Sequence, residues 1–178
     1  MGLRTMDPKE LQVNPFTVFD DDWALLTVGT EDRLNAMTIS WGGLGTFWGR
    51  AVATVYVGLG RCTKELMDAC DTFSVTWLPR EHRADLGWLG SHHARDFGWD
   101  KVSHTHLTPL MVDGTPTFEE AELVLVCRKA YADLMPREGF VDPQAESTWY
   151  SEADDAVEDW HTLYIGYVEQ VLVRDEAS

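Results

Sequence analysis

The sequence contains few cysteines, few cations and no long apolar run. Its three cysteines form neither an even disulfide framework nor a CxxC pair. No run of about 18 apolar residues occurs, and the first residues, MGLRTMDPKELQV, lack the apolar region of a signal peptide. These absences favour a soluble protein of the reducing cytoplasm, with no membrane span.

Positive charge is scarce. Lys and Arg number 14 against 30 Asp and Glu, which gives a net charge of −16. A surface of this sign repels nucleic acid and anionic membranes, so neither is expected as a partner. A bound anion would need a local group of donors that outweighs the overall field.

The length and the apolar content indicate one folded domain. The chain has 178 residues, of which 44% are hydrophobic, enough for a sizeable core. No internal repeat or linker divides it, so we expect a single domain over 1–178 with its core at about 23–173. Residues 135–160 are acidic and irregular, and are predicted to form a surface excursion.

Most of the chain has the pattern of β-strands. Apolar, β-prone or alternating segments predict strands at 23–30, 35–41, 51–57, 73–78, 121–134 and 161–173. Helices are predicted at 63–70, with Thr63 as N-cap, and at 80–90. The sum is a mainly antiparallel β-barrel with a few helices.

One stretch, NAMTISWGGLGTFWG at 35–49, combines a strand with many glycines and two tryptophans. We expect the strand to be followed by a wide glycine-rich loop that carries Trp41 and Trp48. One strand face is small and polar, with Thr38 and Ser40 after Asn35. Such a face is typical of a half-exposed strand, but beside this loop it is a candidate lining for a planar ligand.

The segment VYVGLGRCTKELMDA places a strand, Gly58-Leu59-Gly60 and then a helix. A helix N-terminus beside Arg61, Thr63 and Lys64 can bind an anion, although a capped helix with a solvated arginine is the simpler alternative. The segment also approaches the dinucleotide motif GxGxxG, but Thr63 replaces the third glycine and no βαβ alternation surrounds it.

The remaining reactive side chains form no recognisable catalytic set. The histidines have no zinc-site spacing and are expected at the surface or as caps, so no metal site is predicted. Cys62 follows the glycines; it is either a buried, inert thiol or a group that faces a ligand.

Five segments in order resemble the flavin reductase-like family of FMN-binding split barrels, which includes flavoredoxins. They are NAMTISWGGLGTFWGRAVATVYV, RCTKELMDACDTFSVTWL, LGWLGSHHARDFGWDK, GTPTFEEAELVLVCRKAYADLM and HTLYIGYVEQVLV. The similarity runs from about Trp23 to Val173. It implies a mainly β split barrel with a few short helices and FMN as the flat ligand.

The resemblance also implies cofactor-binding positions. They lie on the strand at 35–41, at the start of the first predicted helix and in the loop after the second predicted helix. We add Cys62, which follows Arg61 directly. The predicted cofactor-binding set is Asn35, Thr38, Ser40, Trp41, Arg61, Cys62, Thr63, Ser91, Arg95 and Lys101. Relatives often have Arg-Pro where this chain has Gly58-Leu59 and an aromatic residue at Cys62. The loop also has His93-Ala94 in place of Ser-Gly, with one extra residue.

The activity implied by the resemblance is that of an FMN-dependent flavin reductase. NAD(P)H would pass a hydride to flavin N5, the protein would position the rings, and no side chain would act as a catalytic nucleophile. The family also implies a homodimer with FMN near the interface. Two alternatives stay open: a flavoredoxin-like electron carrier served by a partner protein, and a non-catalytic flavin-binding protein.

Overall fold

The computed structural model describes residues 2–150 and 160–175. The strands are β1 (Leu3–Met6), β2 (Ala24–Gly29), β3 (Leu34–Ile39), β4 (Gly42–Phe47), β5 (Arg50–Gly58), β6 (Thr72–Trp77), β7 (Pro109–Val112), β8 (Thr115–Phe118), β9 (Leu123–Leu134) and β10 (His161–Arg174). The α-helices are α1 (Thr17–Asp20), α2 (Cys62–Ala69), α3 (Arg83–Ser91) and α4 (Pro143–Trp149). Each predicted strand and helix is present, with ends shifted by a few residues.

Short 3₁₀ helices complete the described chain. They are η1 (Pro8–Glu10), η2 (Arg80–His82), η3 (Ala94–Phe97), η4 (Lys101–His104) and η5 (Arg137–Gly139). Of these, η3 and η4 lie in the loop after α3, where the resemblance places part of the flavin site. No helix among the described residues is long and apolar enough to cross a membrane.

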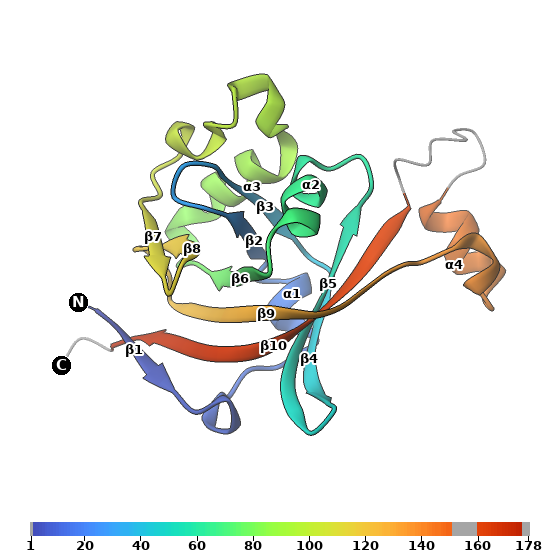
Figure 1. Cartoon of the computed structure of the whole chain (residues 1–178), viewed down its shortest axis with the longest axis horizontal. Helices are drawn as coiled ribbons and strands as arrows, with labels where there is room; N and C mark the ends of the chain where they lie inside the picture. Colours follow the sequence, from blue (N-terminus) through green and yellow to red (C-terminus); the bar gives the residue numbers. More distant parts are fainter. Residues whose placement is uncertain (1, 151–159, 176–178) are drawn as a thin grey trace.

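The main sheet is antiparallel and open. Its strand order is β3–β2–β6–β9–β10–β5–β4, and β1 pairs with the far end of β10. The edge strands β3 and β4 are separated in sequence only by Ser40 and Trp41. The chain therefore passes from one edge of the sheet to the other in two residues, which brings the two edges together at this point. Figure 1 shows the resulting split barrel, crossed by the long strands β9 and β10.

The antiparallel pairing excludes a dinucleotide-binding βαβ unit after β5. Helix α2 connects β5 to β6, but these two strands are not neighbours, because β9 and β10 lie between them. A Rossmann site needs adjacent parallel strands on either side of the helix. The glycines at 58 and 60 therefore serve another purpose.

The glycine-rich stretch is a strand, and the prediction of a wide loop was wrong. Residues Gly42–Phe47 pair with β5 from Gly42↔Val55 to Phe47↔Arg50. A Cβ atom at Gly42 would overlap the ring of Phe19, so this glycine reflects tertiary packing and not a turn. The turn itself is Trp48-Gly49, both at positive φ, as in the type I′ turns that suit two-residue hairpins.

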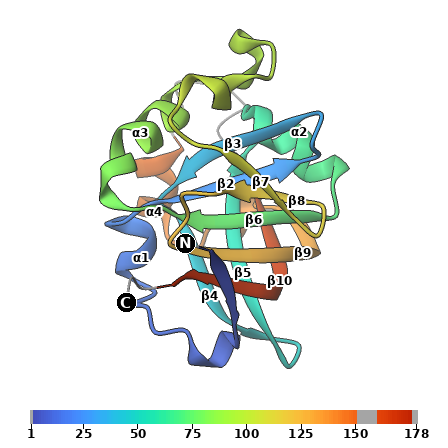
Figure 2. The same ribbon diagram turned by 90° about the vertical axis from the view of Figure 1, so that its left-hand side faces the viewer.

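Two buried layers stabilise the barrel. Strand β2 is buried along its whole length because its two faces enter different layers. Leu26 and Val28 join the barrel interior, while Leu25 joins a second layer beneath α3 and the β7–β8 hairpin. The helices α2 and α3 thus lie at one end of the barrel, on either side of β3 (Figure 2).

Candidate functional site

A pocket of about 250 Å³ lies where the two edges of the sheet meet. Its wall includes the end of β3 and the two residues that follow, from Met37 to Trp41. The rest comes from four other elements; these residues are Tyr56, Gly58, Arg61, Gly90 and His161. The pocket therefore combines parts of the chain that are more than a hundred residues apart.

Strand register accounts for the far wall of the pocket. In the β5–β10 pairing, Gly58 is opposite His161 and Tyr56 is opposite Leu163. The C-terminal end of β5 and the start of β10 thus share one edge of the site. After Gly58 the chain turns through Gly60 into α2.

Helix α2 begins one residue earlier than predicted. Its N-cap is Arg61, which has no side-chain capping bond, and Thr63 is the second residue of the helix, where it is 1% exposed. Thr63 was predicted to be the N-cap, but its hydroxyl instead accepts a hydrogen bond from Asn35. The N–H groups of Arg61 and Lys64 already donate to the carbonyls of Gly58 and Arg61. The helix dipole still gives this end of α2 a partial positive charge, next to the Arg61 guanidinium.

Asn35 is buried against the start of α2. It is 2% exposed, and its Nδ2 lies 2.9 Å from Thr63 Oγ1. Its Oδ1 has no hydrogen-bond partner among the described residues. An orphaned polar atom in the interior is costly unless a water, an ion or a bound group satisfies it.

Close contact between β3 and α3 shapes the floor of the pocket. The Thr38 hydroxyl donates to the Leu86 carbonyl at 2.5 Å. A Cβ atom at Gly90 would lie 3.2 Å from Thr38 Cβ, so a glycine allows the last turn of α3 to approach the strand. The Thr38 hydroxyl is therefore committed to the helix, and its role here is to hold α3 in place.

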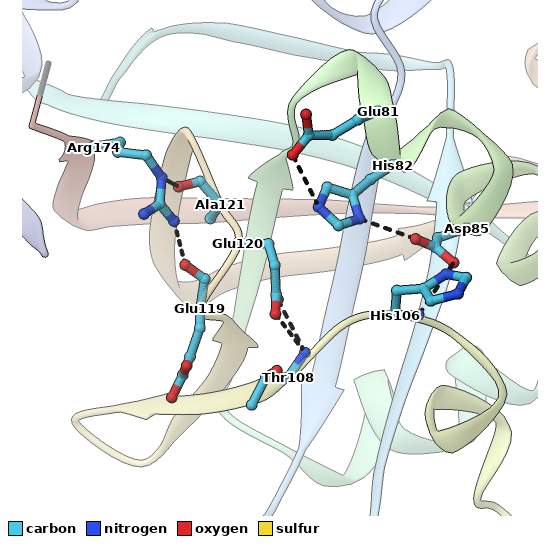
Figure 3. A network of polar contacts seen from close by, with 9 residues as sticks. All are labelled: Glu81, His82, Asp85, His106, Thr108, Glu119, Glu120, Ala121 and Arg174. Atoms are coloured by element: carbon cyan, nitrogen blue, oxygen red, sulfur yellow. Dashed lines mark hydrogen bonds and ion pairs between the residues drawn. The ribbon is translucent and has the colours of Figure 1, made fainter. Parts of the chain in front are cut away.

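A polar network anchors the other end of α3 (Figure 3). Asp85 is 6% exposed, and its carboxylate lies 3.0 Å from a ring nitrogen of both His82 and His106. Burial alone would raise the pKa of Asp85, but the hydrogen bonds from these two histidines hold it below its ordinary value. Both histidines fix the helix that carries Gly90. His106 is exposed, as the histidines were predicted to be, whereas His82 is half-buried.

Trp41 forms the outer lip of the pocket and is 39% exposed. Its ring centroid lies 5.3 Å from the His161 ring and 5.2 Å from the ring of Trp149 on α4. His161 Nδ1 in turn lies 3.0 Å from the Tyr150 hydroxyl. His161 thus belongs to the pocket wall, which the prediction of surface or capping histidines did not anticipate.

The three predicted loop residues lie around the end of α3, but not in the pocket wall. Ser91 Oγ lies within 3.2 Å of the carbonyls of Gly87 and Trp88, so its hydroxyl is hydrogen-bonded to the last turn of α3. Arg95 is paired with Glu65 of α2 at 3.4 Å. These side chains are already engaged and would have to reorient to reach a ligand in the pocket.

Lys101 is the most deeply buried cation of the region, at 3% exposure. Its ammonium donates to the carbonyls of Leu89 at 2.8 Å and His92 at 3.1 Å, which caps the C-terminal end of α3. Burial lowers the pKa of Lys101 to about 8; nearby Cys62 counters this, and Arg61 adds to it. Lys101 therefore lies behind the pocket wall, close to Arg61 and Cys62 at the start of α2.

Cys62 is buried, at 4% exposure, as the first residue of α2. It is a free thiol, as are Cys70 and Cys127. The side chain supports the helix start from inside and does not line the pocket. Of the two interpretations of Cys62, this placement favours the buried, inert thiol.

The structure brings part of the predicted set together. Thr38, Ser40, Trp41 and Arg61 line the pocket, while Asn35, Cys62 and Thr63 form a layer directly behind its wall. Six further lining residues were not in the predicted cofactor-binding set: Met37, Ile39, Tyr56, Gly58, Gly90 and His161. The strand periodicity could have indicated Tyr56, but nothing local to His161 indicates that it faces Gly58.

Solved structures with this architecture were found over nearly the whole chain. No protein-family model and no curated protein matches it. Flavoredoxin from Methanosarcina acetivorans is 14% identical with a TM-score of 0.65, over 97% of this chain and 76% of that one. An FMN-binding protein from Thermus thermophilus, with bound p-hydroxybenzaldehyde, is 19% identical with a TM-score of 0.64, over 97% and 82%. Nitrilotriacetate monooxygenase component B from Bacillus cereus is 15% identical with a TM-score of 0.66, over 96% and 81%.

These similarities establish the fold. The chain has the split β-barrel architecture of FMN-binding, flavin reductase-like proteins, as the five sequence segments predicted. At such low identity the likeness does not extend to activity, which has to be argued from the pocket.

Proposed function

We propose that the pocket binds FMN. The observation that carries this proposal is the convergence of two features on one pocket: the N-terminus of α2 beside Arg61, and an aromatic lip at Trp41. A phosphate fits the first and a flat ring the second. Several solved structures with the same fold are described as FMN-binding proteins, which supports this choice of ligand.

Different residues of the pocket would hold different parts of FMN. Arg61 and the first turn of α2 would bind the phosphate, while the β3 end, from Thr38 to Trp41, would lie along the ring. Asn35, Thr63 and Lys101 would keep these groups in place from behind. The pocket would provide binding and orientation, and a bound flavin would supply the redox chemistry.

We infer an oxidoreductase of the flavin reductase type, with NAD(P)H as reductant. The pocket has an open lip next to Trp41 and His161, so a second planar molecule could reach a flavin from this side. Nothing in this chemistry requires a side-chain nucleophile. The single experiment that tests the proposal is a visible spectrum of the purified protein with FMN, followed by titration with NADH and NADPH. A flavin band that is bleached by either nucleotide supports the proposal, and a protein that retains no flavin refutes it.

A flavoredoxin-like electron carrier is the second candidate. It is favoured by the likeness to flavoredoxin and by the net charge of −16, which suits docking of a positively charged protein. Bound FMN that ignores NAD(P)H but is reduced by a ferredoxin-type donor would favour this function. Bound FMN that responds to neither would indicate the third alternative, a non-catalytic flavin-binding protein.

We also propose a homodimer that covers the tip of the β4–β5 hairpin. Phe47 and Trp48 are stacked at 4.0 Å there, and both are about half exposed. Tyr131 and Tyr167 lie beside Trp48, at 6.5 and 6.1 Å between ring centroids. Soluble monomers rarely expose such an aromatic patch. Light scattering should give twice the chain mass at micromolar concentration with FMN bound, and a monomer would refute the dimer.

The cellular compartment is proposed to be a reducing cytoplasm. The three cysteines are all free, and Cys62 and Cys127 are buried. Burial raises the pKa of the Cys127 thiol strongly, so this group is inert toward oxidants.

A further inference from the structure

A second cavity lies beside the first half of α3, whereas the candidate flavin pocket lies at the end of this helix. The volume of the second cavity is about 800 Å³, against about 250 Å³ for the pocket. Leu86 lines the second cavity, and Gly90, about one helical turn later, lines the pocket. The two share none of their described lining residues. The second cavity is therefore a separate feature, and the proposed function does not use it.

The walls of the second cavity are largely apolar and come from four parts of the chain. They are the segment around α1, the end of β6, α3 and the start of β9. Apart from the half-buried Val13, the apolar wall residues are at most 8% exposed. Cavities of about 300–1,000 Å³ with such walls are typical of sites for small molecules. The apolar wall residues are Val13, Val18, Trp77, Leu78, Leu86 and Leu123.

Two polar side chains of the wall are already engaged by the fold. Trp77 Nε1 donates to the Val18 carbonyl at 2.7 Å. The Arg83 guanidinium donates to the carbonyls of Asp21 at 2.9 Å and Asp22 at 2.8 Å, which ties the end of α1 to α3. A molecule inside the cavity therefore meets an apolar wall, and the remaining charged groups lie at the mouth.

The mouth of the second cavity is acidic. Its exposed charged residues, apart from Arg83, are Asp21, Asp22, Arg80 and Glu122. With Arg83 included, three carboxylates and two guanidinium groups leave a net charge of −1, in a chain whose net charge is −16. This field attracts a cation and repels an anion. It also opposes a second copy of the same acidic chain as the occupant.

We propose that the second cavity is a binding site for a small apolar amine. The apolar body would lie against Trp77 and its neighbours, where its removal from water supplies the favourable free energy. The ammonium would stay hydrated at the mouth beside Asp21, Asp22 and Glu122, and would provide selection by charge. This site goes beyond the proposed flavin function and does not depend on it, so the amine should bind with or without FMN.

The test is a calorimetric titration of the full chain with adamantylamine, which has a compact apolar body and no flat ring to stack on the aromatic lip of the flavin pocket. Adamantanol and adamantane carboxylate carry a neutral and a negative group on the same body. The amine should bind more tightly than the alcohol, by about 1.4- to 5-fold for each carboxylate that its ammonium reaches. The carboxylate should bind most weakly. Equal affinity for the amine and the alcohol would refute the proposal.

A pair of double variants tests the charge selection. Asp21→Asn with Asp22→Asn should reduce the preference for the amine over the alcohol. The matched control is Glu31→Gln with Asp32→Asn, which makes the same change in net charge on the exposed turn between β2 and β3. This control should keep the preference. An equal reduction in both double variants would refute the acidic mouth as its source.

Val13→Trp locates the bound amine, because an indole at this position should fill part of the cavity and abolish binding of the amine and the alcohol alike. Val141→Trp, at a position that is 99% exposed, is the matched control and should bind as the wild type does. Wild-type affinity in Val13→Trp, or displacement of the amine by excess FMN, would refute the site. If light scattering shows that Val13→Trp changes the molecular mass, the occupant is a second copy and the amine site is refuted. A protein that binds no FMN would refute the proposed function and leave this test intact.

Discussion

Arg61→Ala is the substitution that most directly tests the phosphate site. Arg61 is exposed at the N-cap of α2, and its guanidinium makes no hydrogen bond or ion pair within the described residues. The change therefore removes no interaction that holds the fold. It also relieves the effect of Arg61 on the pKa of buried Lys101. We expect the stability of the variant to match that of the wild type, so that the effect is on binding.

The expected magnitude follows from the charge on the ligand. A hydrogen bond between a guanidinium and a phosphate contributes about 1.5–3 kcal/mol, which corresponds to a loss of about 10- to 150-fold in FMN affinity. Riboflavin has no phosphate and should lose much less. The preference of the protein for FMN over riboflavin should fall by most of this factor.

The assay is a titration of each flavin followed by quenching of flavin fluorescence, at low and high salt. Added salt should reduce the ratio of FMN affinity to riboflavin affinity in the wild type, because it screens the partly exposed ion pair between Arg61 and the phosphate. Arg4→Ala is the matched control: it makes the same change to the net charge of −16. Arg4 pairs with Val173 near the end of β10, roughly 40 Å along the strand from His161.

Equal weakening of FMN and riboflavin binding by Arg61→Ala would refute the proposed phosphate site. Arg61 would then support the ring or the local fold. The same conclusion would follow if Arg4→Ala reproduced the loss, because the effect would then be one of net charge. The remaining cations near the pocket, Arg95 and Lys101, are engaged with Glu65 and with the end of α3, so a phosphate bound there would require both to reorient.

Three further predictions test the lip, the interior and the strand packing. FMN should quench tryptophan fluorescence, and Trp41→Phe should reduce this quench; an unchanged quench would place Trp41 away from the ring. Because the pKa of Lys101 is lowered from 10.5 to about 8, the free energy of unfolding should rise between pH 8 and 10.5, by up to about 3 kcal/mol, in the wild type but not in Lys101→Met. Gly42→Ala should cost about 1–3 kcal/mol in urea unfolding through its clash with Phe19, whereas Gly45→Ala, which meets open space, should not.

The strands were predictable because their signal is local. β2 has six residues and β5 has nine, and both strands are apolar with several β-branched residues. This pattern can be recognised from consecutive residues alone. The position of Arg61 at the start of α2 was predictable for the same reason, since a strand, two glycines and the helix follow one another directly. The N-cap residue of α2 was not predictable, because the Thr63 hydroxyl accepts a hydrogen bond from Asn35, which lies 28 residues earlier in the sequence.

Strand β4 was missed because its glycines are explained by distant partners. Glycine is unfavourable in strands, so three glycines in four residues suggested a loop. Phe19 occupies the space beside Gly42, and Thr54 lies against Gly43. His161 was missed for a similar reason: its place in the pocket depends on pairing with Gly58, about a hundred residues away in sequence. Register between distant strands is a property of the folded sheet.

Trp41 and Trp48 show how one local pattern can serve two purposes. Both stand beside glycines and looked equivalent in the sequence, as two aromatic residues of one loop. Because β4 separates them, they lie roughly 20 Å apart along the hairpin. Trp41 is at the split of the barrel, where the sheet edges meet and the pocket opens, and Trp48 is at the hairpin tip with Phe47. The flat surface inferred from this stretch is therefore two surfaces: one beside the pocket, where we propose that FMN binds, and one at the hairpin tip, where we propose contact with a second copy of the chain.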